Sequence, residues 1–328
     1  MEGRKRPTFL ELGDHHLEID MKSPTDDLWA LHRREMDRFH RGMEGEGDVN
    51  LLQLKVEIAK RILDSCHLCE RDCGARRSSG ERGHCGVLES RVYSDFIHMG
   101  EEPPLIPSYT VFFAGCTFEC VFCQNYDIST EPTAGVHLEP EVMADRIERV
   151  ACPSGPTGRS SRALNVNWVG GDPTPNLPYV LQVLERTRCD VPQVWNSNMY
   201  LSLDSMELLD GVIDIYLTDL KYGNDTCALR LSNAPRYWEV VTRNHLLAAD
   251  NAEMIVRHLV MPNHLECCTR PILEWLSESL PNALVNVMAQ YRPMHRAKDF
   301  PDIAVPLRWE EYIQAREWAE DLGLHLVQ

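Results

Sequence analysis

The sequence has no run of about 18 apolar residues, which is the length that a membrane-spanning helix needs. Its first 16 residues contain no apolar signal core, so we expect no secretory signal peptide. Internal repeats and long low-complexity segments are also absent from the sequence. These absences predict a cytoplasmic protein with no membrane partner.

Basic residues are in short supply. The 33 Lys and Arg residues are outnumbered by 50 Asp and Glu residues, which gives a net charge of −17. An acidic surface repels phosphate backbones, so we expect no nucleic-acid partner. With 328 residues, of which 43% are hydrophobic, the chain is long enough for one large α/β domain with additions.

Cysteine, in contrast, is abundant, at 12 residues. Without secretion, reduced thiols that bind metals are a better interpretation than disulfides. Cys116, Cys120 and Cys123 are separated by three and then two residues, and they follow an apolar run that ends in Gly115. Such a group suits soft metals and iron–sulfur clusters. Three thiolates leave one iron of a four-iron cluster open to a substrate, by the logic of open zinc sites. A zinc knuckle or simple buried thiols are the alternatives.

A second cysteine group lies upstream, within a glycine-rich segment whose turns could wrap thiolates round a centre. Its spacings of 2, 3 and 11 residues are not those of a standard zinc finger, so zinc and a second iron–sulfur cluster both stay open. Four free thiols are the alternative. The members of this group are Cys66, Cys69, Cys73 and Cys85.

From Thr110 onward, apolar β-rich runs alternate with helical patterns, which predicts parallel strands wound into a barrel or open barrel. Six strands are too few for a full eight-stranded barrel. The expected strands are 111–114, 164–169, 193–198, 213–219, 254–261 and 284–288, with an edge strand at 324–327. The expected helices are 26–40, 56–63, 140–150, 178–186, 205–209, 238–247, 271–280 and 309–322.

The C-x3-C-x2-C motif at the end of the first strand resembles the signature of the radical S-adenosylmethionine (SAM) enzymes. With Phe122 before the last cysteine and Gln124-Asn125 after it, it is similar to homologues of the pyruvate formate-lyase activating enzyme. The resemblance implies a partial (β/α)6 TIM-like barrel at 106–328. It would follow a charged helical extension at 1–65 and a Cys-rich metal-binding segment at 66–105.

The resemblance also implies a cofactor cradle at the carboxyl ends of the strands. Gly170-Gly171-Asp172 resembles the GGEP motif that takes the SAM amino group, with Asp in place of Glu; a tight turn is the alternative. Asp219 and Lys221 share one face of an extended segment and resemble the Asp-x-Lys motif of the activating enzyme. Arg257, inside an apolar strand, must be paired or face a polar lumen, and resembles an Arg that approaches the cofactor; an ion pair with a neighbour such as Glu253 is the alternative.

Two further cofactor contacts carry substitutions. In the segment Asn196-Ser197-Asn198-Met199, the activating enzyme has Asp-Thr-Asn-Gly, whose Asp and Thr help to hold a monovalent cation. Here Asn196 replaces the Asp and Met199 replaces the Gly, while Ser197 and Asn198 remain polar contacts or loop caps. Tyr291 replaces a His that contacts the nucleoside.

Other thiols and imidazoles are expected near the mouth of the barrel. Each could be a buried structural residue, part of a second metal centre, a radical relay or a substrate contact. They are Cys227, His264, Cys267, Cys268 and His295. Cys152 and Cys189 receive no role.

The resemblance therefore predicts an oxygen-sensitive radical SAM oxidoreductase. It would cleave SAM reductively at a 4Fe–4S cluster to a 5′-deoxyadenosyl radical, with electrons from a ferredoxin or flavodoxin, and abstract hydrogen from a substrate. A peptide or glycyl-radical protein is favoured over a small metabolite or lipid, and a non-catalytic iron–sulfur or zinc protein is a further alternative. The substitutions at Asn196, Met199 and Tyr291 argue against pyruvate formate-lyase itself as the target.

Overall fold

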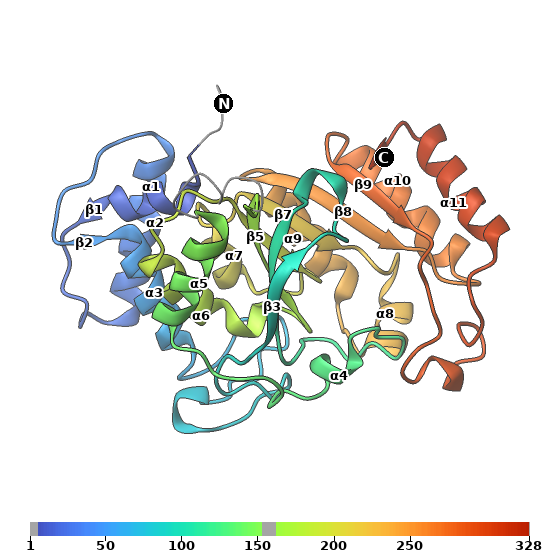
Figure 1. The fold of residues 1–328 in the computed structure, drawn as a ribbon, viewed down its shortest axis with the longest axis horizontal. Helices are drawn as coiled ribbons and strands as arrows, with labels where there is room; N and C mark the ends of the chain where they lie inside the picture. The colour runs from blue at the N-terminus through green and yellow to red at the C-terminus, as the bar shows by residue number, and fades with distance from the viewer. Residues whose placement is uncertain (1–5, 153–161, 328) are drawn as a thin grey trace.

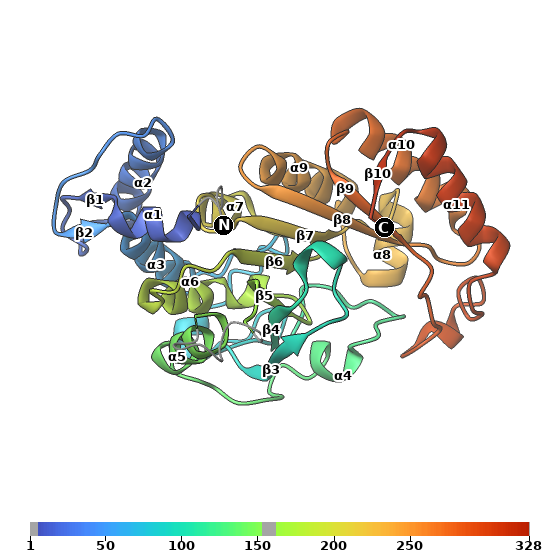
Figure 2. The same ribbon diagram turned by 45° about the horizontal axis from the view of Figure 1, so that its top comes forward.

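The computed structural model describes residues 6–152 and 162–327. Its centre is a twisted eight-stranded sheet in the order β10-β9-β8-β7-β6-β5-β4-β3 (Figures 1 and 2). Strands β4 to β10 are parallel, and β3 pairs antiparallel with β4 at one edge. The strands are β3 (Val92–His98), β4 (Ser108–Phe113), β5 (Asn165–Gly170), β6 (Gln193–Ser197), β7 (Ile215–Asp219), β8 (Glu253–Leu259), β9 (Leu284–Met288) and β10 (His325–Leu326).

The middle strands are covered on both faces, which explains their nearly continuous apolar sequences. Every residue of β6 is buried, and β5 has only one partly exposed residue. The ring of Trp168 on β5 stacks on that of Phe113 on β4, with 6.1 Å between ring centroids. This packing holds the carboxyl ends of β4 and β5 in register.

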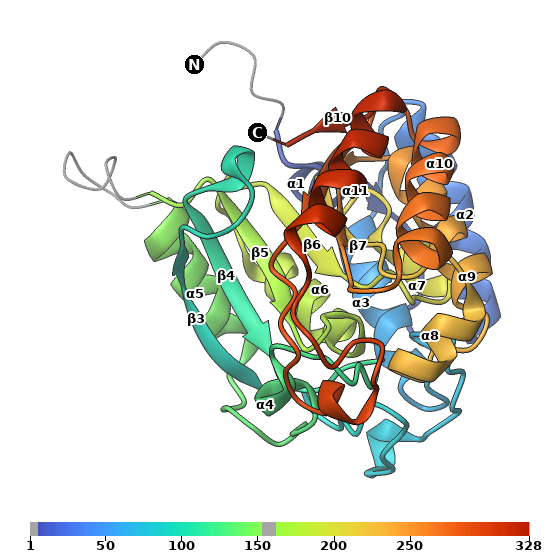
Figure 3. The same ribbon diagram turned by 90° about the vertical axis from the view of Figure 1, so that its right-hand side faces the viewer.

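Helices lie along the sheet and connect its parallel strands (Figure 3). Together with the strand order, they confirm the predicted α/β fold with a mostly parallel sheet, as in a partial TIM-like barrel. The helices are α1 (Thr8–Asp14), α2 (Thr25–His40), α3 (Leu51–Ile62), α4 (Tyr126–Ser129), α5 (Pro140–Ala151), α6 (Leu177–Arg186), α7 (Leu203–Leu209), α8 (Asp225–Ser232), α9 (Tyr237–Ala249), α10 (Arg270–Ser279) and α11 (Trp309–Asp321). Within residues 6–152 and 162–327, none of them combines the length and the apolar composition that a membrane span requires.

The N-terminal region packs on the domain more closely than its charged sequence indicates. Helices α1 to α3 and the small antiparallel pair β1 (His16–Leu17) and β2 (Val49–Asn50) form one end of the molecule in Figure 1. Phe9, Leu12, Leu28 and Leu51 are almost completely buried and belong to the same hydrophobic cluster as the strands. The sparse apolar residues of this region are therefore sufficient to anchor it.

Several elements were not expected from the sequence, among them β3 and α8. Strand β3 is an exposed edge strand whose apolar and polar residues do not alternate regularly. Helix α8 has only eight residues and begins after Asn224, whose side-chain oxygen accepts a hydrogen bond from the Cys227 amide at 2.8 Å. Strands β7 and β8 are shorter than predicted. Ile213 lies before the first residue of β7, and Met261 lies after the last residue of β8.

Candidate active site

The loop after β4 carries the three cysteines of the C-x3-C-x2-C motif, as the sequence predicted. Gly115 begins the loop with a φ of 86°, and a Cβ there would lie 2.4 Å from a methyl group of Val87. The loop rests on the end of α8, because the amides of Glu119 and Val121 donate to the carbonyls of Ser232 and Leu231 at 3.1 and 2.9 Å. The position of the three thiols is thus fixed by α8 as well as by β4.

Each thiol of this loop has a polar neighbour. The Ser232 hydroxyl donates to Cys120 Sγ at 2.9 Å, the Phe118 amide donates to Cys116 Sγ at 3.4 Å, and Cys123 Sγ lies 3.4 Å from the Ser129 hydroxyl. Burial raises the pKa of Cys120 to about 11, although the nearby Lys221 opposes this shift. A bound metal would instead lower the pKa of the thiol, since coordination deprotonates it.

The three thiols face a pocket of about 410 Å³ at the carboxyl edge of the sheet. The ends of β4 to β9 all contribute to its wall, as expected for this fold class. The residues predicted for the site that line it are Cys116, Cys120, Cys123, Gly170, Gly171, Asp172, Asn196, Ser197, Asn198, Asp219, Lys221 and Arg257. The structure therefore brings together residues that lie up to about 140 positions apart in the sequence.

The two glycines after β5 are required by the backbone that surrounds them. A Cβ on Gly170 would lie 2.2 Å from the Phe113 carbonyl oxygen, and one on Gly171 would lie 2.2 Å from the Gly115 carbonyl oxygen. Gly170 also has a φ of 146°. These glycines permit β5 to approach the cysteine loop, in addition to lining the pocket.

Asp172 is buried, and its carboxylate connects its own loop after β5 to the end of β6. Its carboxylate accepts hydrogen bonds from the Thr174 amide at 2.9 Å, the Asn198 amide at 3.0 Å and the Ser197 hydroxyl at 3.1 Å. Burial raises the pKa of Asp172, and these hydrogen bonds oppose the shift. In this structure the carboxylate therefore positions the loop after β6 as well as lining the pocket.

The segment after β6 supports the pocket in an unexpected way. Met199 has a φ of 60°, a left-handed conformation that L-residues rarely adopt, at the position where the activating enzyme has Gly. The Asn198 side-chain amide donates to Thr117 at 2.9 Å and reaches Cys116 Sγ at 3.9 Å. This segment thus contacts the cysteine loop directly.

An ion-pair network lines the same pocket as the thiols and forms its charged floor. Asp219 pairs with Lys221 at 2.5 Å and with Arg257 at 2.9 Å. Burial alone would raise the pKa of Asp219, but the positive charges of Arg257 and Lys221 outweigh it and lower the pKa to about 2. Arg257 also donates to Asn196 at 2.5 Å, so its partners are Asp219 and Asn196 rather than Glu253.

Glu101 is a pocket residue that sequence reasoning missed. It lies in the connection between β3 and β4, 3.7 Å from Arg257, and its burial raises its pKa. The Asn167 side chain donates to it at 2.9 Å. The signal in the sequence was an acidic pair, Glu101-Glu102, in the segment that precedes the apolar first strand.

The structure does not bring Tyr291 to the pocket wall. Its ring packs on Phe122 at 5.9 Å, and its hydroxyl donates to the Ile303 carbonyl at 2.6 Å. The neighbouring Gln290 lines the pocket instead. His295 stacks on the exposed Tyr126 at 5.1 Å, outside the pocket.

The upstream cysteine group lies against the cysteine loop. Arg71 donates twice to the Thr117 carbonyl, at 3.0 and 3.1 Å, and the Cys85 carbonyl lies close to Gly115. Burial raises the pKa of the Cys69 thiol, and its proximity to Cys85, Cys66 and Cys73 raises it further. A metal among the four thiols stays a prediction.

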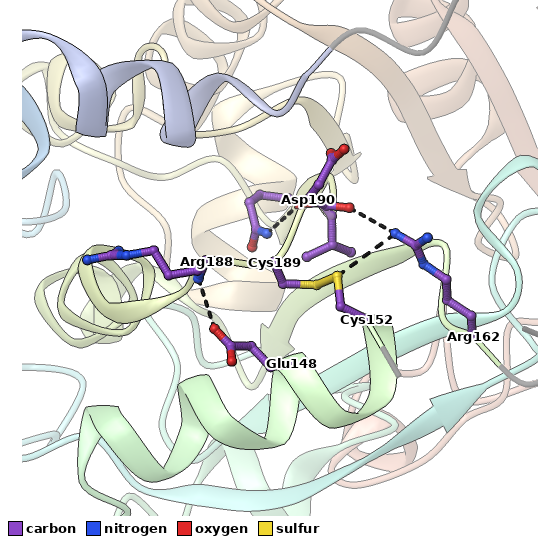
Figure 4. Close-up of a disulfide and its surroundings, with 8 residues drawn as sticks. Glu148, Cys152, Arg162, Arg188, Cys189 and Asp190 are labelled. Carbon is purple, nitrogen blue, oxygen red and sulfur yellow. Dashed lines mark hydrogen bonds between the residues drawn. A yellow bond between two sulfur atoms is a disulfide. The ribbon is translucent and has the colours of Figure 1, made fainter. Parts of the chain in front are cut away.

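Cys152 and Cys189, which received no role, form a disulfide between the end of α5 and the segment before β6 (Figure 4). Arg162 donates to the Asp190 carbonyl at 2.9 Å beside it, and Glu148 accepts from the Arg188 amide at 3.0 Å. Because Cys189 precedes β6, this disulfide lies at the amino edge of the sheet, opposite the pocket. It departs from the expectation that the thiols are reduced.

The fold and the site together define an α/β protein with a three-thiol centre at the carboxyl edge of its sheet. The model of the Radical SAM superfamily matches residues 110–276, which is just over half of the chain. The chain belongs to the radical SAM superfamily. That superfamily implies a 4Fe–4S cluster and SAM as cofactors. The three thiols, the 410 Å³ pocket and its charged floor fit both groups.

One curated relative and two solved structures are similar to this chain. The chain is 46% identical to "Uncharacterized protein MJ0674" of Methanocaldococcus jannaschii over 313 residues, which cover 92% of this chain and 89% of the relative. It is 11% identical to methylornithine synthase (PylB), with a TM-score of 0.46, over 97% of this chain and 84% of that one. It is 13% identical to Streptococcus suis SuiB bound to its precursor peptide SuiA, with a TM-score of 0.46, over 64% of this chain and 46% of SuiB, so it spans less than half of that protein. The family assignment depends on the superfamily match.

Proposed function

We propose that this protein is a radical SAM oxidoreductase that abstracts a hydrogen atom from a peptide or protein. One observation carries the proposal: Cys116, Cys120 and Cys123 line the same pocket as the buried network of Asp219, Lys221 and Arg257. When bound, the cluster and SAM would supply a 5′-deoxyadenosyl radical on one-electron reduction. A ferredoxin or flavodoxin is the class of donor that suits the low potential required.

The chain's own residues would hold the cofactors. The three thiolates would ligate three irons, and the fourth iron would stay free of protein ligands, as in other open metal sites. Lys221 and Arg257 are fixed cations that favour the SAM carboxylate, because Asp219 keeps them charged and oriented. Gly170, Gly171 and Asp172 are proposed for the amino group, with Ser197 and Asn198 as further polar contacts.

An exposed edge of the sheet supports a peptide as the substrate. Strand β3 is last in the strand order, and Tyr93, Phe96, Ile97 and Met99 expose between 39% and 62% of their surface there. An edge strand with apolar side chains is a site where an extended peptide adds as a further strand. The strand leads to His98, Gly100 and Glu101, which line the pocket. A peptide paired with β3 would run alongside β4, whose carboxyl end carries the cysteine loop.

The closer relation to glycyl-radical activating enzymes is part of this proposal. The motif around Cys116 and the Asp219-Leu220-Lys221 segment support it. Asn196 stands where those enzymes have the Asp that helps to hold a monovalent cation. Its side-chain oxygen accepts a hydrogen bond from Arg257 and is therefore already engaged. We therefore propose a peptide or a glycyl-radical partner other than pyruvate formate-lyase.

The upstream thiols are proposed as a second centre. Cys66, Cys69, Cys73 and Cys85 would hold zinc or a second iron–sulfur cluster next to the cysteine loop. Counting iron, sulfide and zinc in Cys66→Ala/Cys69→Ala protein tests this. If that variant loses neither iron nor zinc, the second centre does not exist.

The proposed function is tested by anaerobic reconstitution, reduction and addition of SAM. We expect 5′-deoxyadenosine from the wild type and none from the Cys116→Ala/Cys120→Ala/Cys123→Ala variant. Deuterium should then enter deoxyadenosine from a deuterated peptide fraction of cell extract. Transfer from the deuterated small-molecule fraction alone would contradict the peptide assignment, and absence of deoxyadenosine would contradict the enzyme assignment.

The edge strand offers a second test of substrate class. Phe96→Lys places a charge on the exposed edge, and should lower deuterium transfer from peptide while leaving deoxyadenosine formation without peptide in place. Leu246→Lys on α9, a similarly exposed apolar position, is the matched control. Equal effects of the two substitutions would show that β3 does not bind the substrate.

A further inference from the structure

A further group of thiols, separate from the upstream cysteines, lies at the carboxyl edge of the sheet and outside the pocket. Cys227 is in the first turn of α8, after β7, whereas the other members follow β8. Because β7 and β8 are neighbours, their carboxyl-end loops meet. The ligand atoms of Cys227, His264, Cys267 and Cys268 all lie within 4.8 Å of one another.

The distances in this group match a tetrahedral metal site. Metal–ligand bonds of about 2.3 Å for Zn–S and about 2.0–2.1 Å for Zn–N place tetrahedral ligand atoms roughly 3.8 Å (S to S) and 3.6 Å (S to N) apart. His264 Nδ1 lies 3.6, 3.3 and 3.6 Å from the sulfurs of Cys227, Cys267 and Cys268. Cys267 Sγ lies 3.9 Å from each of the other two sulfurs. Hydrogen bonding alone does not require four such atoms to converge.

The imidazole is held in the tautomer that a metal needs. His264 is buried, and its Nε2 lies 2.9 Å from a carboxylate oxygen of Asp302. This contact places a proton on Nε2 and leaves Nδ1 free to coordinate. A carboxylate–histidine–metal arrangement of this kind orients the ring and raises its basicity. Arg230 in turn pairs with Asp302 and fixes the carboxylate.

The sulfurs also have outer-shell partners. The Asn224 side-chain amide donates to Cys227 Sγ at 3.4 Å, to Cys268 Sγ at 3.9 Å and to the Cys267 carbonyl at 2.7 Å. A Cβ on Gly223 would lie 2.8 and 2.9 Å from the carbonyl oxygens of Cys268 and Cys267, so only glycine permits the two loops to approach this closely. Cys267 and Cys268 belong to a π-helical turn, Leu265–Thr269, a feature that is frequent at functional sites.

We propose that Cys227, His264, Cys267 and Cys268 bind one Zn²⁺ in a closed, structural site. Three thiolates and one imidazole are a Cys3His set, which is typical of structural zinc. All four positions of a tetrahedron are filled by protein, so no position remains for a substrate. Three thiolates and Zn²⁺ carry a net charge of −1, and the pair of Asp302 and Arg230 beside His264 leaves this total unchanged.

The zinc would connect two parts of the molecule. Helix α8 carries a ligand, Cys227, in its first turn and Ser232 at its end, where the Ser232 hydroxyl donates to Cys120 Sγ. Tyr222 also contacts Ser232, at 2.5 Å. A metal that holds the start of α8 to the π-helical turn would therefore fix the support on which the iron-binding loop rests. This role does not depend on which substrate the protein uses.

The test is metal analysis of the full chain, purified anaerobically from cells supplied with zinc and iron. We expect about one zinc per chain in the Cys66→Ala/Cys69→Ala protein, which lacks the upstream centre, with zinc K-edge absorption showing three sulfurs at about 2.3 Å and one nitrogen at about 2.0–2.1 Å. His264→Ala/Cys267→Ser should lose at least about nine-tenths of this zinc and keep the iron bound at Cys116, Cys120 and Cys123. Cys123→Ser should lose iron and keep the zinc.

A matched variant guards against loss by unfolding. His325→Ala changes an exposed imidazole on β10 and should keep both metals. Circular dichroism of each variant reports whether the fold is intact. Zinc that is absent from the Cys66→Ala/Cys69→Ala protein, or that survives when His264→Ala/Cys267→Ser is added to it in a folded protein, would overturn the proposal. Iron at this site, with a ferric thiolate absorption lost in the double variant, would overturn the choice of metal.

Discussion

Two thiol groups at one edge of the same sheet have different geometries. Cys116, Cys120 and Cys123 stand on a single loop around a 410 Å³ pocket with charged walls. Cys227, His264, Cys267 and Cys268 come from two loops and converge to within 4.8 Å of one another, with a carboxylate behind the imidazole. Three thiols beside an open volume suit a reactive centre, whereas four ligands that close on one point suit a structural metal. Residue type alone does not separate these roles, but ligand number and the space beside the ligands do.

Breaking the open group should have the largest effect. Cys120→Ser removes one of three cluster ligands, so we expect deoxyadenosine formation to fall by at least about 1,000-fold, equivalent to roughly 4 kcal/mol in the barrier. Cys267→Ser, in the closed group, should lower it by less than about tenfold. The measurement is deoxyadenosine per chain under single-turnover conditions with dithionite. Equal losses in the two variants would contradict the distinction between the groups.

The charged floor distinguishes the open group from the closed one. Asp219→Asn leaves Lys221 and Arg257 without their shared counter-charge, so we expect the free energy of unfolding to fall by about 3–5 kcal/mol. Glu320→Gln, which breaks an exposed pair with Arg316, should cost less than about 1 kcal/mol. Urea denaturation of the cluster-free proteins measures both. If Asp219→Asn lowered the free energy of unfolding by less than Glu320→Gln does, the network would not stabilise the pocket.

The same network gives a pH dependence with a definite sign. Because the folded pKa of Asp219 is lowered from 3.8 to about 2, the unfolded state binds more protons in this interval. Its stabilisation, about 2 kcal/mol, should be complete above pH 4 and disappear as the pH falls towards 2. The stability difference between wild type and Asp219→Asn should therefore narrow over this range. A constant difference would contradict the assigned pKa.

The outer shell of the closed group can be weakened without removing a ligand. Asp302→Asn keeps the shape of the side chain but removes the charge behind His264, so zinc affinity should fall by about 10–100-fold. Competition with a chromophoric chelator measures this. Asp299→Asn, an exposed neighbour in sequence, is the control. Identical affinities in both variants would show that Asp302 does not orient the imidazole.

The smallest effect should come from the helix that joins the two groups. Ser232→Ala removes the hydrogen bond to Cys120 Sγ, which favours the reduced and more negative cluster. A loss of about 1 kcal/mol corresponds to a potential lower by ~40 mV for one electron. Redox titration followed by electron paramagnetic resonance (EPR) measures the shift, with Ser277→Ala on α10 as the control. An unchanged potential would show that this contact does not tune the centre.

Much of the open site could be predicted from the sequence because its residues sit where apolar strands end. The runs before Gly170, Asp219 and Gln290 marked β5, β7 and β9. Glu101 was not predicted because it lies in the connection after β3. That strand is an exposed edge strand whose apolar and polar residues do not alternate regularly. Tyr291 was placed by its position alone, whereas packing on Phe122 turns it away.

The closed group was harder to predict for a different reason. Cys227 and Cys267 are 40 residues apart, and no short spacing connects them. Only the adjacency of β7 and β8, together with the π-helical turn, brings their sulfurs together. The need for glycine at Gly170 and Gly223 could not be predicted from the sequence either. At both positions a Cβ would clash with a neighbouring backbone carbonyl group. Contacts of this kind depend on the assembled fold.

The central claim is that the iron centre at Cys116, Cys120 and Cys123 has a site open to SAM. Electron–nuclear double resonance on the reduced protein with SAM labelled with ¹⁵N at its amino group tests it directly. We predict a ¹⁵N hyperfine coupling that appears with labelled SAM and disappears, together with the EPR signal of this centre, in Cys120→Ser. A reduced cluster whose spectrum shows no coupling to saturating SAM would contradict the claim.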